Sequence, residues 1–204
     1  MRKSFVVHLV LCTTLSAVLA AQTSVAPAVG EKARDFALSS LEGKTVRLSE
    51  EIGRGPVVLV VLRGWPGYDC PFCTRQFADY LGHAVELEKE GARVLFVYPG
   101  PADGLKEHAE AFLSSRELPR HFTVVLDPEF TFTNAYALRW EARGETAYPS
   151  TFVIDKAGTV RFANISKEHG GRVPVADVLK ALAGLRESAS SERAGSPEKT
   201  GPRV

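Results

Sequence analysis

The sequence predicts an α/β domain in which a mixed central sheet carries helices on both faces, and three observations lead to this prediction. Residues 57–62 form a continuous run of β-branched and aliphatic side chains, typical of a central strand buried on both faces. A strand–helix–strand order follows, as in parallel strands joined by a crossover helix. A strand hairpin and an amphipathic helix then close the apolar part of the chain. The 204 residues are enough for one such domain with tails.

The first 21 residues have the pattern of a signal peptide. Arg2 and Lys3 supply a positive start, an apolar stretch covers residues 5–19, and the small residues Ala20 and Ala21 suit cleavage. The stretch is too short and too polar for a membrane span, which needs roughly 20 apolar residues. The alternatives are an uncleaved anchor or a buried N-terminal helix. We therefore expect a periplasmic or secreted protein with no stable membrane span after cleavage.

The rest of the chain divides into a leader at residues 22–30, a folded domain at 31–186 and a tail at 187–204. Within the domain, local patterns predict the following elements in chain order: a hairpin of residues 35–38 and 44–48, a strand at 57–62, a helix at 71–90, a strand at 93–98, a helix at 105–115, a strand at 122–126, a short helix at 130–136, a hairpin of residues 150–154 and 159–162, and a helix at 174–185. The tail has almost no apolar residue, so we expect it to be disordered.

The charge balance gives little indication of a charged partner. The chain has 25 Lys and Arg against 24 Asp and Glu, a formal net charge of +1. Binding to nucleic acid relies on an excess of positive charge. We therefore expect no nucleic-acid partner.

The chemistry is expected at a Cys-Pro-Phe-Cys motif. Cys12 leaves with the signal peptide, so the mature protein keeps Cys70 and Cys73. A disulfide between them closes too small a loop to stabilise the fold much, which points to a reactive role. Pro71 suits the first position of a helix, which places Cys70 at the N-cap and Cys73 in the first turn. The helix dipole favours a thiolate there, and we expect Cys70 to be the more accessible thiol and Cys73 the more shielded one.

Three other interpretations of the cysteine pair remain open. A structural zinc site would need two more ligands, and the histidines outside the signal peptide lack ligand spacing: His83, His108, His121 and His169. Two thiolates could instead hold Cu(I) in a carrier protein. The pair could also be inert. We expect neither a resident metal nor a cofactor.

Several segments resemble the peroxiredoxin-like branch of the thioredoxin superfamily, the alkyl hydroperoxide reductase/thiol-specific antioxidant group. These are residues 36–38, the strand at 57–62, the cysteine loop and residues 149–155, and the resemblance covers roughly residues 28–186. It implies a thioredoxin-like fold and reduction of hydroperoxides at the expense of a thiol reductant. In the family pattern Pro-x-x-x-Thr/Ser-x-x-Cys, Pro66 and Cys73 match, while Cys70 stands at the Thr/Ser position. The resemblance therefore implies that Cys73 occupies the peroxidatic position.

A second set of features is similar to thioredoxins and glutaredoxins. Pro149 stands where peroxiredoxins carry an arginine, and it resembles the cis-proline that faces the cysteine pair in thioredoxins. The motif is also similar to the glutaredoxin Cys-Pro-Tyr-Cys. This resemblance implies that Cys70 attacks, that Cys73 resolves, and that Pro149 follows a cis peptide bond beside the pair.

Other side chains near the motif have less specific roles. Trp65 could shield the thiolate or bind a partner, or simply pack in the core. Arg63, Arg161 and Arg172 are candidates to replace the missing arginine, although each is more simply interpreted as a surface charge or a local hydrogen-bonding group. Hydroperoxide reduction ranks first, and thiol–disulfide exchange with protein disulfides is the alternative. The expected partners are a hydroperoxide or disulfide substrate and an unidentified thiol reductant.

Overall fold

The computed structural model describes residues 25–114 and 116–194, so the predicted signal peptide lies outside the described residues. The elements, in chain order, are β1 (Ala37–Ser40), β2 (Thr45–Arg47), α1 (Leu48–Arg54), β3 (Val57–Val61), α2 (Pro71–Gly82), α3 (Ala84–Lys89), β4 (Arg93–Gly100), α4 (Leu105–Leu113), β5 (Phe122–Pro128), α5 (Thr131–Ala135), β6 (Ser150–Ile154), β7 (Val160–Ile165) and α6 (Val175–Ala194). The short helix α1 was not expected from the sequence.

The strands form one mixed sheet, as predicted. Their order is β2-β1-β5-β4-β3-β6-β7, with β3, β4 and β5 parallel and the other pairings antiparallel. The β3 strand lies between β4 and β6, and all five of its residues are buried. Its continuous apolar sequence follows from this position, because both of its faces are covered.

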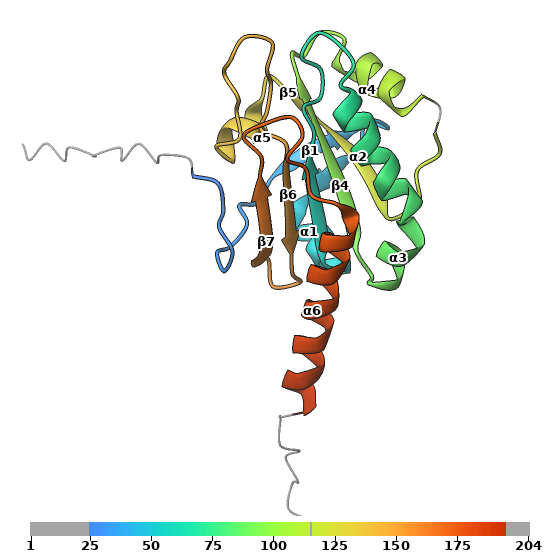
Figure 1. The fold of residues 1–204 in the computed structure, drawn as a ribbon, viewed down its shortest axis with the longest axis vertical. Helices are drawn as coiled ribbons and strands as arrows, with labels where there is room; N and C mark the ends of the chain where they lie inside the picture. Colours follow the sequence, from blue (N-terminus) through green and yellow to red (C-terminus); the bar gives the residue numbers. More distant parts are fainter. Residues whose placement is uncertain (1–24, 115, 195–204) are drawn as a thin grey trace, which may run out of the picture.

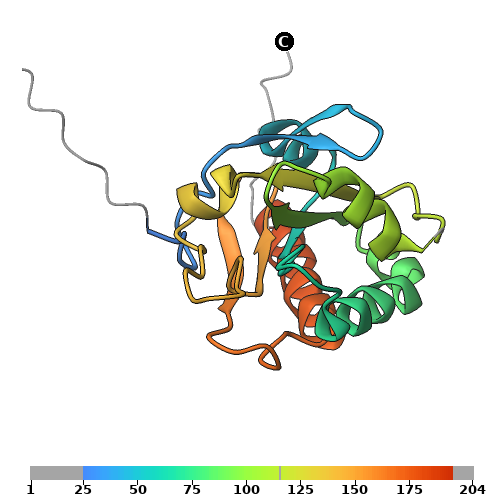
Figure 2. The ribbon, with the colours of Figure 1, turned by 90° about the horizontal axis from the view of Figure 1, so that it is seen from above.

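Helices cover both faces of the sheet (Figures 1 and 2). On one face, α2, α4 and α6 pack over β3 and β4 around the aromatic side chains Phe77, Phe96 and Phe112. On the other face, α1 and α5 pack around Phe132 and Tyr136. The predicted thioredoxin-like architecture is therefore confirmed, and it places the C-terminal end of β3 next to the N-terminus of α2.

The predicted helix over residues 71–90 is two helices, so that prediction is wrong in its length. The α-helical geometry breaks at His83, which has φ −110° and ψ 18°. Gly82 lowers helix propensity by about 1 kcal/mol relative to alanine. The ring Nδ1 of His83 also lies 2.9 Å from the carbonyl oxygen of Asp79, which competes with the helical hydrogen bond.

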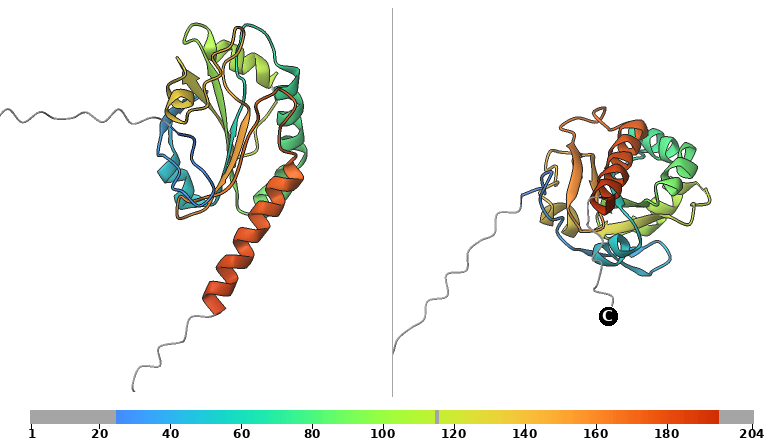
Figure 3. Two further views of the ribbon diagram at one scale, coloured as in Figure 1. Left: turned by 60° about the vertical axis from the view of Figure 1, so that its left-hand side comes forward. Right: turned by 90° about the horizontal axis from the view of Figure 1, so that it is seen from below.

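The closing helix is longer than predicted, because α6 runs to Ala194 and includes the first residues of the expected disordered tail. Its second half extends beyond the rest of the domain (Figure 3). The costly step in forming a helix is its first turn, and adding residues to an existing helix needs little further stabilisation. The packed first half of α6 can therefore extend into a segment that has no apolar face. Among the described helices, none combines the length and apolar character of a membrane span.

Candidate active site

A tight loop between β3 and α2 sets the position of the cysteine pair. The amide of Trp65 donates to the carbonyl oxygen of Pro99 at 2.9 Å, which holds the loop against β4. Gly64 has φ +62°, and a Cβ at this position would lie 1.9 Å from the same oxygen. Only glycine fits such a close approach. The loop therefore fixes where α2 begins at Cys70.

Cys70 is the N-cap of α2 and Pro71 is its first residue, as the motif predicts. The backbone amide of Cys73 donates to the Sγ atom of Cys70 at 3.4 Å. The exposed fractions of Cys70 and Cys73 are 2% and 1%, which is the expected order but a small difference, and both thiols are free. Both cysteines belong to the hydrophobic core on this face of the sheet, and two arginine side chains contact their sulfur atoms.

Arg63 is the first of these arginines, and its exposed fraction is 1%. Its Nη1 lies 3.8 Å from the Sγ atom of Cys70, and its Nη2 donates to the Tyr68 hydroxyl at 2.9 Å and to the Gly144 carbonyl oxygen at 3.1 Å. The Nη2 atom also lies 2.8 Å from Glu145 Oε2, an ion pair by distance whose angle is not that of a hydrogen bond. A buried arginine of this kind needs such partners, and one of them is the Cys70 sulfur.

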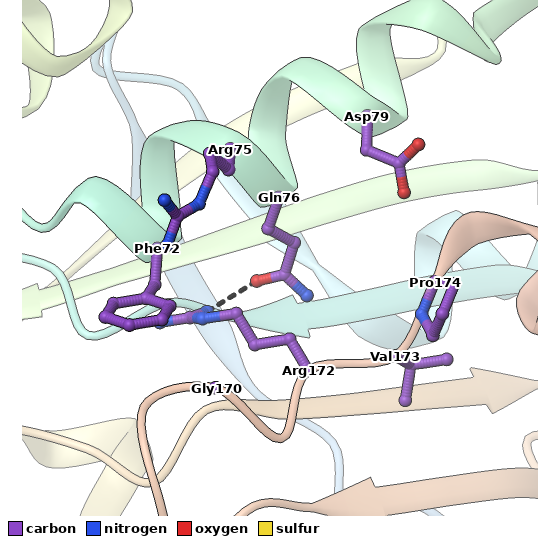
Figure 4. Close-up of a pocket in the computed structure, with 8 residues that line it drawn as sticks. All are labelled: Phe72, Arg75, Gln76, Asp79, Gly170, Arg172, Val173 and Pro174. Atoms are coloured by element: carbon purple, nitrogen blue, oxygen red, sulfur yellow. Dashed lines mark hydrogen bonds between the residues drawn. The ribbon is translucent and has the colours of Figure 1, made fainter.

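Arg172 is the second arginine and reaches the cysteines from the loop between β7 and α6. Its Nη2 lies 3.2 Å from the Sγ atom of Cys73 and 3.9 Å from that of Cys70. Its Nη1 donates to Gln76 Oε1 at 2.5 Å (Figure 4). Its Nε donates to the carbonyl oxygen of His169 at 3.3 Å. These bonds orient the guanidinium group across both sulfur atoms.

The two thiols differ strongly in acidity. A hydrogen bond from the thiol of Cys73, a second from its backbone amide, and the Arg172 and Arg63 guanidinium groups outweigh burial and lower the pKa of Cys70 to about 5. Burial, together with the hydrogen bond that Cys73 donates to Cys70, raises the pKa of Cys73 well above its usual range. At neutral pH the pair is therefore a Cys70 thiolate and a Cys73 thiol.

A carboxylate links the buried arginine to the rim of the site. The Glu145 side chain pairs with Arg63 through Oε2, and its Oε1 lies 2.9 Å from Nε2 of His169. The ring of His169 lies 6.0 Å from the ring of Phe72, one of the two residues between the cysteines. In the described part of the chain, no group of three or more His, Cys, Asp and Glu side chains is arranged to hold a metal ion.

The other predicted site residues lie at the same end of the sheet, but their roles remain predictions. Trp65 and Pro66 are half-buried, and the Trp65 ring stacks on His108 with 3.6 Å between centroids. Pro149 is buried just before β6. The expected cis bond is wrong, because residues 25–114 and 116–194 contain no cis peptide bond. The trans form of an X–Pro bond is more stable than the cis form by about 0.5–1 kcal/mol. With Pro149 in the trans form, the backbone amide of Tyr148 donates to the carbonyl oxygen of Leu138 at 2.8 Å.

The sequence did not predict which arginine side chains contact the cysteine pair. Arg63 and Arg172 contact the cysteine pair, although the simpler interpretation of both was a surface or local role. Arg161 does pair locally, with Asp155 at 2.6 Å. One available signal was the position of Arg63 directly after a fully apolar strand, where a free surface charge is unusual.

A cysteine pair that caps a helix at the C-terminal end of a central strand, with one acidic thiol, defines a thiol-dependent oxidoreductase of the thioredoxin fold class. Residues 29–163 match the AhpC/TSA family, and the chain belongs to that family. The resemblance stated from the sequence is therefore confirmed.

The chain is similar to relatives named as thiol-disulfide oxidoreductases and to relatives named as peroxiredoxins. The thiol-disulfide oxidoreductase ResA of Geobacillus thermodenitrificans is 35% identical over 67% of this chain and 68% of its own. The chloroplastic peroxiredoxin Q of Triticum aestivum is 30% identical over 63% of this chain and 54% of its own. The crystal structure of the peroxidoxin BcpB from Mycobacterium tuberculosis, 24% identical, superposes with a TM-score of 0.59 over 79% of this chain and 97% of its own, which is a likeness of fold.

Proposed function

We propose that the protein is an exported thiol–disulfide oxidoreductase in which Cys70 makes the first attack and Cys73 resolves the mixed disulfide. The observation that carries this proposal is the opposite shift of the two pKa values, lowered to about 5 at Cys70 and raised at Cys73. The thiolate is the nucleophile in disulfide exchange, so the acidic thiol attacks first. Hydroperoxide reduction, ranked first on the sequence, becomes the second candidate.

The same contacts support the resolving step. The Cys70 thiolate attacks one sulfur of a substrate disulfide, the substrate bond breaks, and one substrate thiolate leaves and takes a proton from water. Cys70 is then uncharged, and two of the contributions that raise the pKa of Cys73 are lost, while Arg172 still lies 3.2 Å from its sulfur. Cys73 therefore loses its proton more easily, attacks Cys70 and releases the second substrate thiol. A thiol reductant then returns two electrons to the pair.

Hydroperoxide reduction at Cys73 is supported by one observation, the 3.2 Å contact between Arg172 and the Cys73 sulfur. A guanidinium group in that place could polarise a peroxide. Two features weigh against it. The pKa of Cys73 is raised, and Cys70 occupies the position where the family pattern has a hydroxyl group.

The two single variants Cys70→Ser and Cys73→Ser separate the candidates. For disulfide exchange, Cys73→Ser should accumulate a mixed disulfide on Cys70 with a small aromatic disulfide, and Cys70→Ser should be inert. For peroxide reduction, Cys70→Ser should instead form a sulfenic acid on Cys73 with one equivalent of hydrogen peroxide. Mass spectrometry of the trapped adducts reads both outcomes, with the double variant as background. Sulfenic acid on Cys73 together with no mixed disulfide on Cys70 would overturn the exchange proposal.

Export is part of the same proposal and rests on the N-terminal sequence. We infer cleavage after Ala20 or Ala21, which leaves a mature chain with two cysteines in a compartment where disulfides persist. The intact mass of protein recovered from an export-competent host measures the cleavage site. Recovery of the full-length chain would refute it.

A further inference from the structure

A pocket lies next to the Arg172 side chain, which separates it from the cysteine pair. Its volume is about 400 Å³, within the range of small-ligand sites. Phe72, Arg75 and Gln76 line it from the first two turns of α2, and Arg172 lines it from the opposite loop (Figure 4). Because Arg172 also contacts both sulfurs, a ligand in the pocket shares a guanidinium group with the redox pair.

The charge of the pocket is mainly positive. Among the described residues, no carboxylate lies within 4 Å of the guanidinium group of Arg75 or Arg172, whereas most of the other arginines make such pairs. Arg75 lies over the Phe72 ring, with 4.6 Å between its Cζ atom and the ring centroid. Asp79 also lines the pocket, but it accepts a hydrogen bond from the Val175 amide at 3.2 Å at the start of α6. The two arginines are thus left to bind an anion.

Oxidation of the cysteine pair changes the charge that Arg172 faces. In the reduced protein, the Cys70 thiolate is the negative group nearest to Arg172. A disulfide carries no charge, so oxidation leaves Arg172 without a counter-ion in the described structure. The pocket should therefore attract anions more strongly when the pair is oxidised.

We infer that this pocket binds the carboxylate of a small thiol that reduces the oxidised protein. The inference rests on the proposed function and names the class of its reductant, a low-molecular-mass thiol with a carboxylate near the sulfur. Guanidinium groups bind carboxylates through charge-assisted hydrogen bonds, and Arg75 and Arg172 lie on opposite walls of a space large enough for such a molecule. The Arg172 side chain separates the pocket from the sulfurs, so a carboxylate bound to Arg172 holds the thiol one side chain away from the disulfide.

The reduction is balanced as follows. The thiolate of the bound molecule attacks the Cys70 sulfur, the Cys70–Cys73 bond breaks, and Cys73 leaves and takes up a proton. A second thiolate attacks the ligand sulfur of the mixed disulfide, which releases Cys70 as a thiolate and forms a small-molecule disulfide. Two thiols are oxidised, and the protein disulfide gains two electrons.

Binding can be tested without redox chemistry, by titrating (methylthio)acetate and the neutral (methylthio)acetamide into oxidised and reduced protein and measuring the heat. We expect the carboxylate to bind the oxidised protein about tenfold more tightly than the amide, as a charge-assisted bond allows. The preference should be smaller for the reduced protein. Equal affinities of the two compounds for oxidised protein would overturn the inference.

Two variants and a control identify the group responsible. Arg75→Gln should lose most of the preference for the carboxylate, and Arg75→Lys should keep part of it because it keeps the charge. Arg120→Gln is the matched control, since Arg120 is 88% exposed and pairs with Glu88 at the opposite end of the sheet. A preference that survives in Arg75→Gln at the wild-type level would contradict the assignment of the site.

Reduction rates with mercaptoacetate and mercaptoacetamide, each divided by the thiolate concentration, give the second measurement. We expect the ratio of these rates to favour mercaptoacetate by about five- to tenfold in the wild type and to approach one in Arg75→Gln. A ratio of one in the wild type refutes the inference even if exchange itself proceeds. If no thiol reduces the protein but the binding preference holds, the proposed function fails and the anion site remains.

Discussion

Cys70 and Cys73 differ because the hydrogen bonds between them run in one direction. Both the backbone amide and the thiol of Cys73 donate to the Cys70 sulfur, so the negative charge is favoured on Cys70 and disfavoured on Cys73. Arg63 and Arg172 add positive charge to the same sulfur. The arrangement gives one thiolate and one protonated thiol from two identical side chains.

This hydrogen bond gives a prediction for the acidity of Cys70. Cys73→Ala removes the side-chain donor, which is the largest contribution to the lowered pKa, so the pKa of Cys70 should rise from about 5 by a unit or more. Cys73→Ser keeps a hydroxyl donor and should stay closer to the wild type. The ultraviolet absorption of the thiolate, measured against pH, gives each midpoint. Identical midpoints for the two variants would show that the side-chain bond does not matter.

At this scale the sequence predicted the cysteines and their helix positions, whereas it offered Arg63 and Arg172 only as candidates beside Arg161. The cysteine geometry is local, because N-cap and first-turn positions follow from Pro71 and the preceding strand. Arg172 lies 99 and 102 residues from the cysteines along the chain, and its contact depends on how the loop before α6 packs. Local patterns carry no information about such a contact.

At the scale of the elements, β3 and α2 together create the site. The fully buried strand ends at the loop held by Gly64, and in the first turn of α2 the Cys73 amide donates to the Cys70 sulfur. Strong local periodicity made these elements predictable. The break at His83 and the extension of α6 depend on weak propensities at helix ends, where sequence patterns are least informative.

The extended part of α6 gives a prediction about stability. The side chains of Arg186, Glu187 and Ser188 are exposed, so the helix buries little apolar surface here. Deleting residues 187–204 should therefore lower the melting temperature by less than about 2 °C, or under about 1 kcal/mol, and should leave thiol exchange unchanged. The Arg186–Glu90 ion pair at 3.2 Å stays in the shortened chain. A loss of several degrees in thermal unfolding would show that the removed segment docks on the domain.

At the scale of the whole molecule, the family fold does not decide between the two reactions. Relatives named for disulfide exchange and for peroxide reduction are similar to this chain over nearly the same share of its length. The sheet brings the C-terminal end of β3, the N-terminus of α2 and the loop before α6 to one edge. The chemistry then depends on which sulfur carries the charge, and that depends on the arginines and hydrogen bonds at this edge.

The acidity of Cys70 also links the redox state of the pair to the stability of the whole protein. Its pKa is about 5 in the folded protein and near 9.0 ordinarily, so between these pH values the unfolded chain binds more protons at this group. The thiolate therefore stabilises the folded, reduced protein fully above about pH 9, and this stabilisation is lost as the pH falls towards 5. The oxidised protein has no thiol to titrate at this site.

We therefore expect the free energy of unfolding of the reduced protein, minus that of the oxidised protein, to fall between pH 9 and pH 5. The slope should approach about 1.4 kcal/mol per pH unit, the value for one proton. Denaturant unfolding of both forms across this range measures the difference, in which the other titrating groups largely cancel. Reduced Cys70→Ser is the control, and its pH dependence should be parallel to that of the oxidised wild type. A difference that does not change between pH 9 and pH 5 would mean that Cys70 is not a thiolate in the folded protein. In that case the assignment of Cys70 as the attacking nucleophile would fail as well.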